Sequence, residues 1–138
     1  MGGVLAIDYG TRKCGFASTD ALRLAREPGQ VLRHEGREEL VLEHVARLLA
    51  ERDVATVVVG LPLDPQGRPG PAAERAQAFV ARLRERFPAL AVEVLDERLT
   101  TKEAEARLRA LGRSGREIRA ERDAWSALVL LEDWLSTH

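Results

Sequence analysis

The chain has 138 residues, with 22 acidic and 21 basic side chains and a formal net charge of -1 at pH 7. This length predicts a single domain over residues 1–138, and the near-neutral charge neither favours nor excludes a polyanionic partner. With one cysteine, Cys14, the chain can form neither a disulfide framework nor a paired-cysteine zinc site.

The first third of the chain is expected to be antiparallel β-structure without a targeting segment. Residues 4–7 form an apolar run typical of a buried strand, which Asp8 interrupts too early for a signal peptide. The glycine-rich stretch YGTRKCG leads into a second strand over residues 14–18, close enough for a hairpin. A third strand is expected near residues 30–33, after a Pro-Gly turn. No apolar run approaches the ~20 residues of a membrane span, so we expect a cytoplasmic protein.

Helix and strand patterns alternate in the middle of the chain. Apolar residues recur at helical spacing between Arg37 and about Arg52. The β-branched run ATVVVGLP is typical of a strand buried on both faces, and Pro71 is suited to open the next helix. A further strand, LAVEVL, is closed by Asp96.

Two helices complete the predicted order. Thr100 and Glu103 have the spacing of a capping box, and Gly112 suits the end of the helix that they would begin. The last helix is expected from about Arg119 to Leu135. The order β-β-β-α-β-α-β-α-α therefore predicts an α/β fold.

Right-handed crossovers would place the fourth and fifth strands parallel to the first, whereas the first three strands are antiparallel. The result is a five-stranded mixed sheet with helices on both faces. Ligands of such sheets bind at the carboxyl ends of strands where the strand order reverses, which makes Asp8 a residue of this rim.

Acidic side chains from three elements could converge at the rim. Asp8 ends the first strand, Asp96 and Glu97 end the fifth, and Asp123 lies early in the last helix at the edge of its inward face. Converging carboxylates repel one another, and a divalent cation removes this cost. Mg²⁺ and Mn²⁺ take oxygen ligands, and two such ions about 4 Å apart can promote hydrolysis of a phosphodiester.

Each acidic residue alone also has a purely structural explanation. Asp8 could cap a turn, and Asp96 or Glu97 could pair with a neighbouring basic side chain. Asp123 could lie in the first turn of its helix and interact with the helix dipole. The argument for a metal site therefore rests on the set rather than on any single member.

Four motifs in order resemble the YqgF/RuvX family of nucleases: DYGTRKCG, VVVGLPLDPQG, DERLTT and RDAWSALVLLEDW. The resemblance covers essentially the whole chain. It implies a ribonuclease-H-like fold and a metal-dependent nuclease that processes the 5′ end of pre-16S ribosomal RNA. The alternative activity within the family is that of a Holliday-junction resolvase acting on branched DNA.

The resemblance implies that Asp8 and Asp123 are catalytic, metal-binding carboxylates, with one acid of the DER motif as the third. Of these two acids we favour Glu97, with Asp96 as the alternative. Strand alternation places the two on opposite sides, so only one of them is expected to face the site. The expected cofactor is Mg²⁺ or Mn²⁺, as two ions.

Cys14 stands where the family usually has an aliphatic residue. We expect it to be a core residue, because a buried cysteine behaves as a small hydrophobe.

Six residues are candidates for contacts with nucleic acid, either structured RNA precursor or branched DNA. Thr11 and Lys13 lie beside Asp8 in sequence, and Arg98 and Thr100 follow Glu97. Arg113 and Arg116 belong to a basic stretch whose phosphate contacts would make binding strongly salt-dependent. The alternatives are helix capping for Thr100 and a solvated surface for the two arginines.

Two other functions have to be compared with the nuclease. Gly10 to Gly15 has the glycine spacing of a Walker loop, but Phe16 and Ala17 replace the required Lys-Ser/Thr pair. The other rival is a non-catalytic, nucleic-acid-binding module for ribosome assembly, because a fold does not establish an activity. A junction resolvase needs two active sites and hence a homodimer, whereas RNA processing needs only a monomer.

Overall fold

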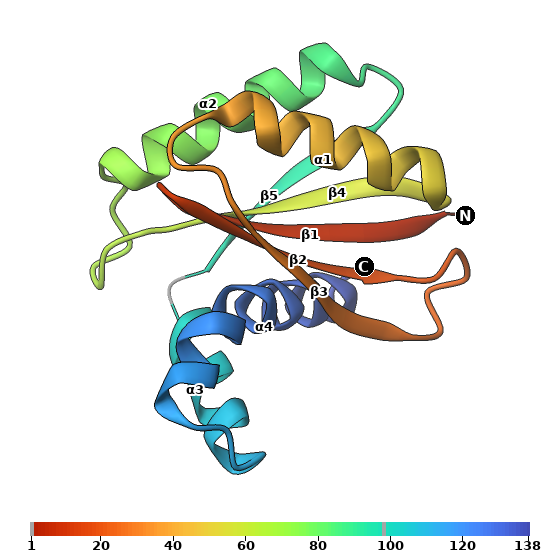
Figure 1. Ribbon diagram of the computed structural model, residues 1–138. Helices are drawn as coiled ribbons and strands as arrows, with labels where there is room; N and C mark the ends of the chain where they lie inside the picture. Colours follow the sequence, from red (N-terminus) through yellow and green to blue (C-terminus); the bar gives the residue numbers. More distant parts are fainter. Residues whose placement is uncertain (1, 98) are drawn as a thin grey trace.

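A computed structural model, which describes residues 2–97 and 99–138, shows one five-stranded sheet between two helical layers (Figure 1). The strand order is β3-β2-β1-β4-β5. The strands are β1 Gly3–Tyr9, β2 Lys13–Thr19, β3 Arg26–Arg33, β4 Val54–Leu61 and β5 Ala91–Asp96. The helices are α1 Glu38–Glu51, α2 Pro71–Arg86, α3 Thr100–Ala110 and α4 Gly115–Ser136.

The pairing of the strands confirms the predicted mixed sheet. β1 and β2 are antiparallel, with Asp8 opposite Gly15, and β2 and β3 are antiparallel as well. β4 pairs in parallel with both β1 and β5. The carboxyl ends of β1, β4 and β5 consequently meet at one edge of the sheet, as expected for strands joined by helical crossovers.

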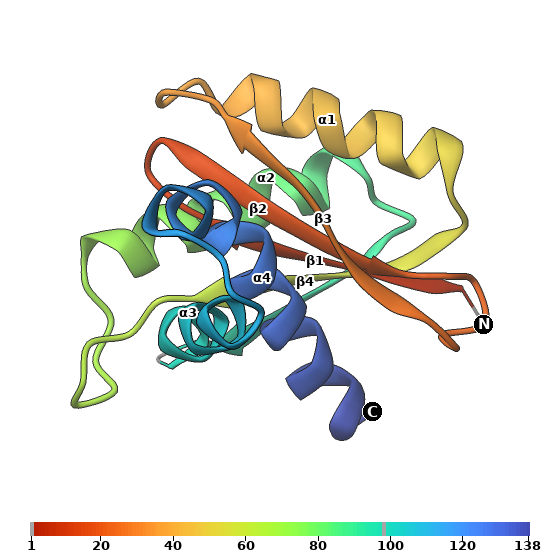
Figure 2. The ribbon, with the colours of Figure 1, turned by 60° about the horizontal axis from the view of Figure 1, so that its bottom comes forward.

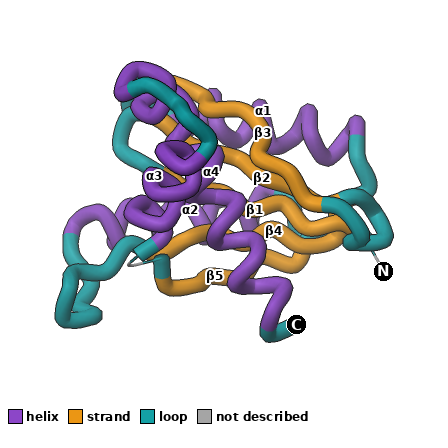
Figure 3. Tube along the Cα trace, turned by 90° about the horizontal axis from the view of Figure 1, so that it is seen from below, coloured by secondary structure: helices purple, strands orange, loops and turns teal. Residues whose placement is uncertain are grey.

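Alternation along β1 divides the core into two layers. Leu5 and Ile7 face α1 and α2, whereas Val4 and Ala6 face α4. Figure 2 shows α4 lying across the sheet on the side opposite α1, with α3 beside its N-terminal part. Figure 3 shows the same face from below, where α4 contacts β1, β2, β3 and β4. Asp8 continues the series of Val4 and Ala6 and therefore lies on the α4 side.

Two element starts and one helix cap differ clearly from the predictions. The Pro-Gly turn predicted before the third strand is wrong: β3 begins at Arg26, and its pairing with β2 runs through Pro28, which an edge strand tolerates. The capping box predicted at Thr100 is wrong: Leu99 precedes the first helical residue and no side chain caps α3. A capping box instead joins Ser114 and Glu117, so α4 starts before the predicted Arg119.

Cys14 confirms its expected role as a small core residue. Its side chain is 0% exposed and packs in the layer that faces α1 and α2. Burial raises the pKa of its thiol to about 12, so the reactive thiolate is disfavoured. Within the described ranges of the chain, no helix has the length and apolar character that crossing a bilayer requires.

Candidate active site

The main chain fixes Glu97 at the end of β5. Its N–H donates to the carbonyl of Leu61 at 3.2 Å, extending the β4–β5 pairing by one residue. Its carbonyl accepts from the N–H and the hydroxyl of Thr100, at 3.3 and 3.1 Å. The Glu97 side chain lies over Gly60, where a Cβ atom would overlap its carboxylate. Glycine at position 60 therefore leaves the space that this carboxylate occupies.

Asp123 reaches the same place from α4. It lies more than two turns inside the helix, which excludes the first-turn interaction with the helix dipole. The backbone of α4 approaches β2 so closely at Gly15 that a Cβ atom there would overlap the Asp123 carbonyl. The Asp123 carboxylate forms an ion pair with Lys13, with 3.4 Å between Oδ2 and Nζ.

Asp8 and Glu97 form a hydrogen-bonded pair of carboxyl groups. Burial raises the pKa of Asp8 to about 6, although the bond to Glu97 opposes the shift and Asp123 adds to it. Burial also raises the pKa of Glu97 to about 10, reinforced by the charge of Asp8 and the hydrogen bond between them. The pair therefore holds a shared proton at neutral pH, as expected for carboxylates that cannot both ionise.

A cavity of about 260 Å³ opens over these groups, and we call it the carboxylate cavity. The residues that line it come from the β1–β2 turn, the ends of β4 and β5, α2, α3 and α4: Asp8, Tyr9, Gly10, Thr11, Lys13, Pro62, Ala72, Arg75, Glu97, Thr101 and Asp123. Five of the predicted site residues are thus gathered in one place. Its lining combines three acidic side chains with two cationic ones.

Two residues of this region escaped the sequence analysis. Arg75 lines the carboxylate cavity, and its Nη2 donates to the Thr11 hydroxyl at 3.1 Å. His34 is 1% exposed and lies behind the turn. Its Nδ1 accepts from the Gly36 N–H at 3.0 Å, which leaves Nε2–H to donate to the Gly10 carbonyl at 2.8 Å. The position of Arg75 one turn after the Pro71 helix start is a signal that could have identified it.

The other predicted residues that the structure describes lie outside the carboxylate cavity. Arg98 falls outside the described residues. Thr100 is 4% exposed, and its hydroxyl donates a hydrogen bond to the Glu97 carbonyl. Thr100 therefore helps to position Glu97. Arg113 forms an ion pair with Glu121 at 3.1 Å, and Arg116 is exposed in the first turn of α4. Asp96 is exposed and lines a different hollow.

The carboxylates suit a hard divalent cation by their chemistry. Oxygen Oε2 of Glu97 is buried and has no hydrogen-bond partner among the described residues, an arrangement that is costly unless another group binds there. Over residues 2–97 and 99–138, no three acidic, histidine or cysteine side chains are already spaced to hold one ion. Binding a cation would therefore require loss of the proton shared by Asp8 and Glu97, and release of Asp123 from Lys13.

Replacement of Glu97 by glutamine is expected to stabilise the metal-free protein increasingly as the pH rises. Glu97 and Asp8 both have raised pKa values, so their contribution to stability is full below about pH 4. It falls as the pH rises through about 6 and towards 10. The glutamine side chain of Glu97→Gln cannot ionise. We therefore expect the free energy of unfolding of this variant to exceed that of the wild type by about 1–3 kcal/mol at pH 9 and by little at pH 5.

Urea unfolding midpoints at pH 5, 7 and 9 in EDTA check this expectation. Glu43→Gln is the matched control, because Glu43 is an exposed acid on α1. Added Mg²⁺ should raise the stability of the wild type but not that of Glu97→Gln. A difference between Glu97→Gln and wild type that stays constant from pH 5 to pH 9 would contradict the raised pKa values.

Comparison with known proteins gives a consistent result over nearly the whole chain. A family profile described as "RuvX: Holliday junction resolvase" matches residues 2–137. A protein of Anaeromyxobacter sp. (strain Fw109-5) named "Putative pre-16S rRNA nuclease" is 46% identical over 132 residues, which cover 95% of this chain and 94% of that protein. A relative of the same name from Chloroflexus aurantiacus (strain J-10-fl) is 40% identical over 133 residues, covering 96% and 85%.

Among solved structures, T. thermophilus RuvC in complex with a Holliday junction substrate matches with a TM-score of 0.53 at 16% sequence identity. The match covers 91% of this chain and 92% of that one. At this identity the likeness concerns the fold, and it confirms the expected ribonuclease-H-like architecture.

Proposed function

Because the chain belongs to the RuvX Holliday junction resolvase family, we propose that it is a metal-dependent nuclease whose cleavage centre is the carboxylate cavity. The single observation that carries this proposal is the half-buried, hydrogen-bonded pair of Asp8 and Glu97 beside Asp123, at the carboxyl ends of two strands. The five strands form one sheet, and the helices lie in layers on its two faces. We therefore treat residues 1–138 as one nuclease domain. Processing of ribosomal RNA would place it in the cytoplasm.

Asp8 and Glu97 would hold the metal, with Asp123 as the third ligand once it leaves Lys13. Glu97 is the member of the DER motif that we assign, because Asp96 lies outside the carboxylate cavity. The carboxylate oxygens suit Mg²⁺ or Mn²⁺, and we propose two ions. When bound, such ions lower the pKa of a water and stabilise the departing oxygen of a phosphodiester.

The basic side of the carboxylate cavity would bind the phosphate at the cleavage point. Lys13 pairs with Asp123, and with Asp123 as a metal ligand the Lys13 ammonium would be available to the substrate phosphate. Arg75 forms no ion pair among the described residues, and its guanidinium is held by Thr11. A planar guanidinium binds a phosphate through two hydrogen bonds and so can orient it. In this assignment Thr11 both positions Arg75 and contacts the phosphate.

Replacement of Arg75 by alanine is expected to lower kcat/KM for cleavage by about 10- to 100-fold, the effect of removing a hydrogen-bonded charge. Arg75→Lys should recover only part of the loss, because lysine cannot form two parallel hydrogen bonds to one phosphate. Arg82→Ala is the matched control, since Arg82 lies on the same helix and pairs with Glu38 at 2.6 Å, outside the carboxylate cavity. Equal losses in Arg75→Ala and Arg82→Ala would show that Arg75 has no special role.

For the substrate, we propose the 5′ end of pre-16S ribosomal RNA, because the relatives that match most of the chain carry that activity in their names. The second candidate is a branched DNA junction, which the family description favours. Paired cuts across a four-way junction need two cleavage centres and thus a homodimer. Cleavage of a precursor RNA can proceed on a monomer.

Side-by-side cleavage of a labelled pre-16S leader RNA and a labelled four-way DNA junction tests the proposal. Each reaction is run with Mg²⁺, Mn²⁺ or EDTA, using the wild type and Asp8→Asn. Metal-dependent cleavage of the RNA by the wild type alone would support ribosome maturation, and symmetric cuts of the junction would support a resolvase. If neither substrate is cut but both are bound, the non-catalytic binding module becomes the better explanation.

A further inference from the structure

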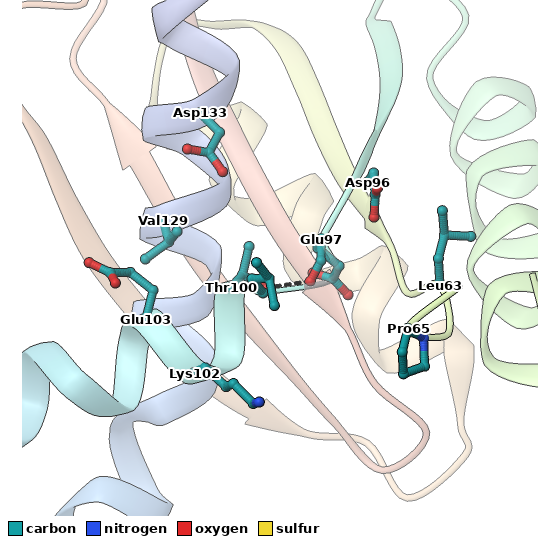
Figure 4. Close-up of a pocket in the computed structure, with 10 residues that line it drawn as sticks. Leu63, Pro65, Asp96, Glu97, Thr100, Lys102, Glu103, Val129 and Asp133 are labelled. Carbon is teal, nitrogen blue, oxygen red and sulfur yellow. Dashed lines mark hydrogen bonds between the residues drawn. The ribbon is translucent and has the colours of Figure 1, made fainter. Parts of the chain in front are cut away.

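A second and larger hollow is also lined by Glu97 (Figure 4). We call it the Leu99 hollow. It measures about 680 Å³ and is lined by Leu63, Pro65, Asp96, Glu97, Leu99, Thr100, Lys102, Glu103, Val129 and Asp133. Glu97 lines both this hollow and the carboxylate cavity. A nucleic-acid strand whose phosphate lies in the carboxylate cavity therefore has an adjoining space for the next nucleotide.

The lining of the Leu99 hollow combines aliphatic surface with carboxylates. Leu99 is 70% exposed, and Leu63 and Val129 also contribute apolar surface to the lining. In Figure 4, Asp96 and Asp133 project from β5 and α4 on either side of Glu97. Lys102 is the one cationic residue among the lining residues that the structure describes. Among the described residues that line the hollow, acidic side chains therefore outnumber basic ones four to one.

This chemistry selects against a phosphate and for a base. The carboxylate of Asp133 would repel the sugar-phosphate backbone, whereas it can accept hydrogen bonds from exocyclic amino groups of adenine, cytosine or guanine. Leu63, Leu99 and Val129 offer apolar contact to the face of a base. The volume falls in the range of ~300–1,000 Å³ that is usual for sites of small organic ligands.

We propose that the Leu99 hollow binds an unpaired nucleobase from the nucleotide next to the phosphate that is cut. The inference rests on the proposed nuclease function, and it names the substrate class: a nucleic acid that is single-stranded, bulged or easily unpaired beside the cleavage point. Extracting a base from a duplex costs a few kcal/mol, so an already unpaired nucleotide is favoured. Described residues of the lining include no aromatic ring, so aliphatic contact and hydrogen bonds replace stacking.

The test compares substrates that differ by a single base. After the cut position has been mapped on the intact substrate, an abasic nucleotide is placed in turn on each side of it. Wild type, Leu99→Ala and Leu111→Ala are assayed on each substrate. Leu111 is the control, because it is 54% exposed just after α3 and lies outside the Leu99 hollow.

The wild type and Leu111→Ala should cut the substrate about tenfold more slowly when the abasic site is at one of the two positions. Leu99→Ala should be slower on the intact substrate and nearly indifferent to loss of the base. Equal rates of the wild type on intact and abasic substrates, or full wild-type discrimination in Leu99→Ala, would overturn the inference while leaving the nuclease function intact. Failure of the wild type to cut any intact substrate would instead remove the proposed function, and the inference with it.

Discussion

The Asp8→Asn variant is expected to fold and to bind nucleic acid, but to lose metal-dependent cleavage by about 10³-fold or more. Asp8 shares a hydrogen bond with Glu97, and its carboxylate would supply oxygen ligands on the strand side of the carboxylate cavity. An amide of the same shape keeps the packing of β1 but offers a neutral ligand and repels a cation through its NH₂ group. The loss should therefore appear in kcat rather than in substrate affinity.

Single-turnover cleavage with saturating enzyme measures this effect, and fluorescence anisotropy measures binding of the same labelled substrate. Asp53→Asn is the matched control, because Asp53 is an exposed aspartate just before β4, at the opposite edge of the sheet. It should cleave at nearly the wild-type rate. If Asp8→Asn retained a tenth or more of the wild-type rate, the carboxylate cavity would not be the cleavage centre.

Gly15→Ala is expected to reduce the free energy of unfolding by about 3 kcal/mol or more, the largest effect on stability that we predict. A Cβ atom at position 15 would overlap the carbonyl group of Asp123 and crowd the N–H of Ala124. These are backbone atoms of α4, so no side-chain rotation can relieve the overlap. Helix α4 must move away from β2, which also moves Asp123 away from Asp8 and Glu97.

Gly115→Ala is the control for this substitution, because a Cβ atom there meets only the end of Arg119, at 3.6 Å. Alanine at the start of a helix should leave stability unchanged or raise it slightly. Urea unfolding of both variants measures the difference, and cleavage assays under native conditions report the displacement of Asp123. A Gly15→Ala variant as stable as the wild type would mean that α4 adapts more easily than this packing indicates.

The strands and most helices could be predicted because their signals are local. Residues 4–7 are four consecutive apolar residues, and residues 57–59 of β4 are three consecutive valines. Pro71 marks the start of α2 where it was expected. The boundary of β3 depended on a partner elsewhere, because β3 extends where β2 offers it hydrogen bonds. The start of α4 is marked by a local signal, the capping box of Ser114 and Glu117, which the predicted start at Arg119 did not take into account.

The basic stretch that contains Arg113 and Arg116 shows that the sequence does not tell which arginines are already paired with acidic side chains. Arg113 and Arg116 are close in sequence, but Arg113 pairs with Glu121 on α4, whereas Arg116 is exposed. Arg107 and Arg122 are also held, by Glu132 at 2.7 Å and Glu105 at 3.0 Å. Arginines that are already paired are less available to phosphate, so the count of basic residues overstates the strength of this surface.

By itself, the sequence determined the order of the elements, the mixed sheet and the candidate acids, since apolar periodicity and strand ends are properties of neighbouring residues. The tertiary structure alone decided which acids meet. It placed Glu97 rather than Asp96 beside Asp8, because strand alternation and the open space over Gly60 point that side chain toward α4. It also brought Arg75 to Thr11 and α4 against Gly15, contacts between residues more than 60 positions apart that no local pattern contains.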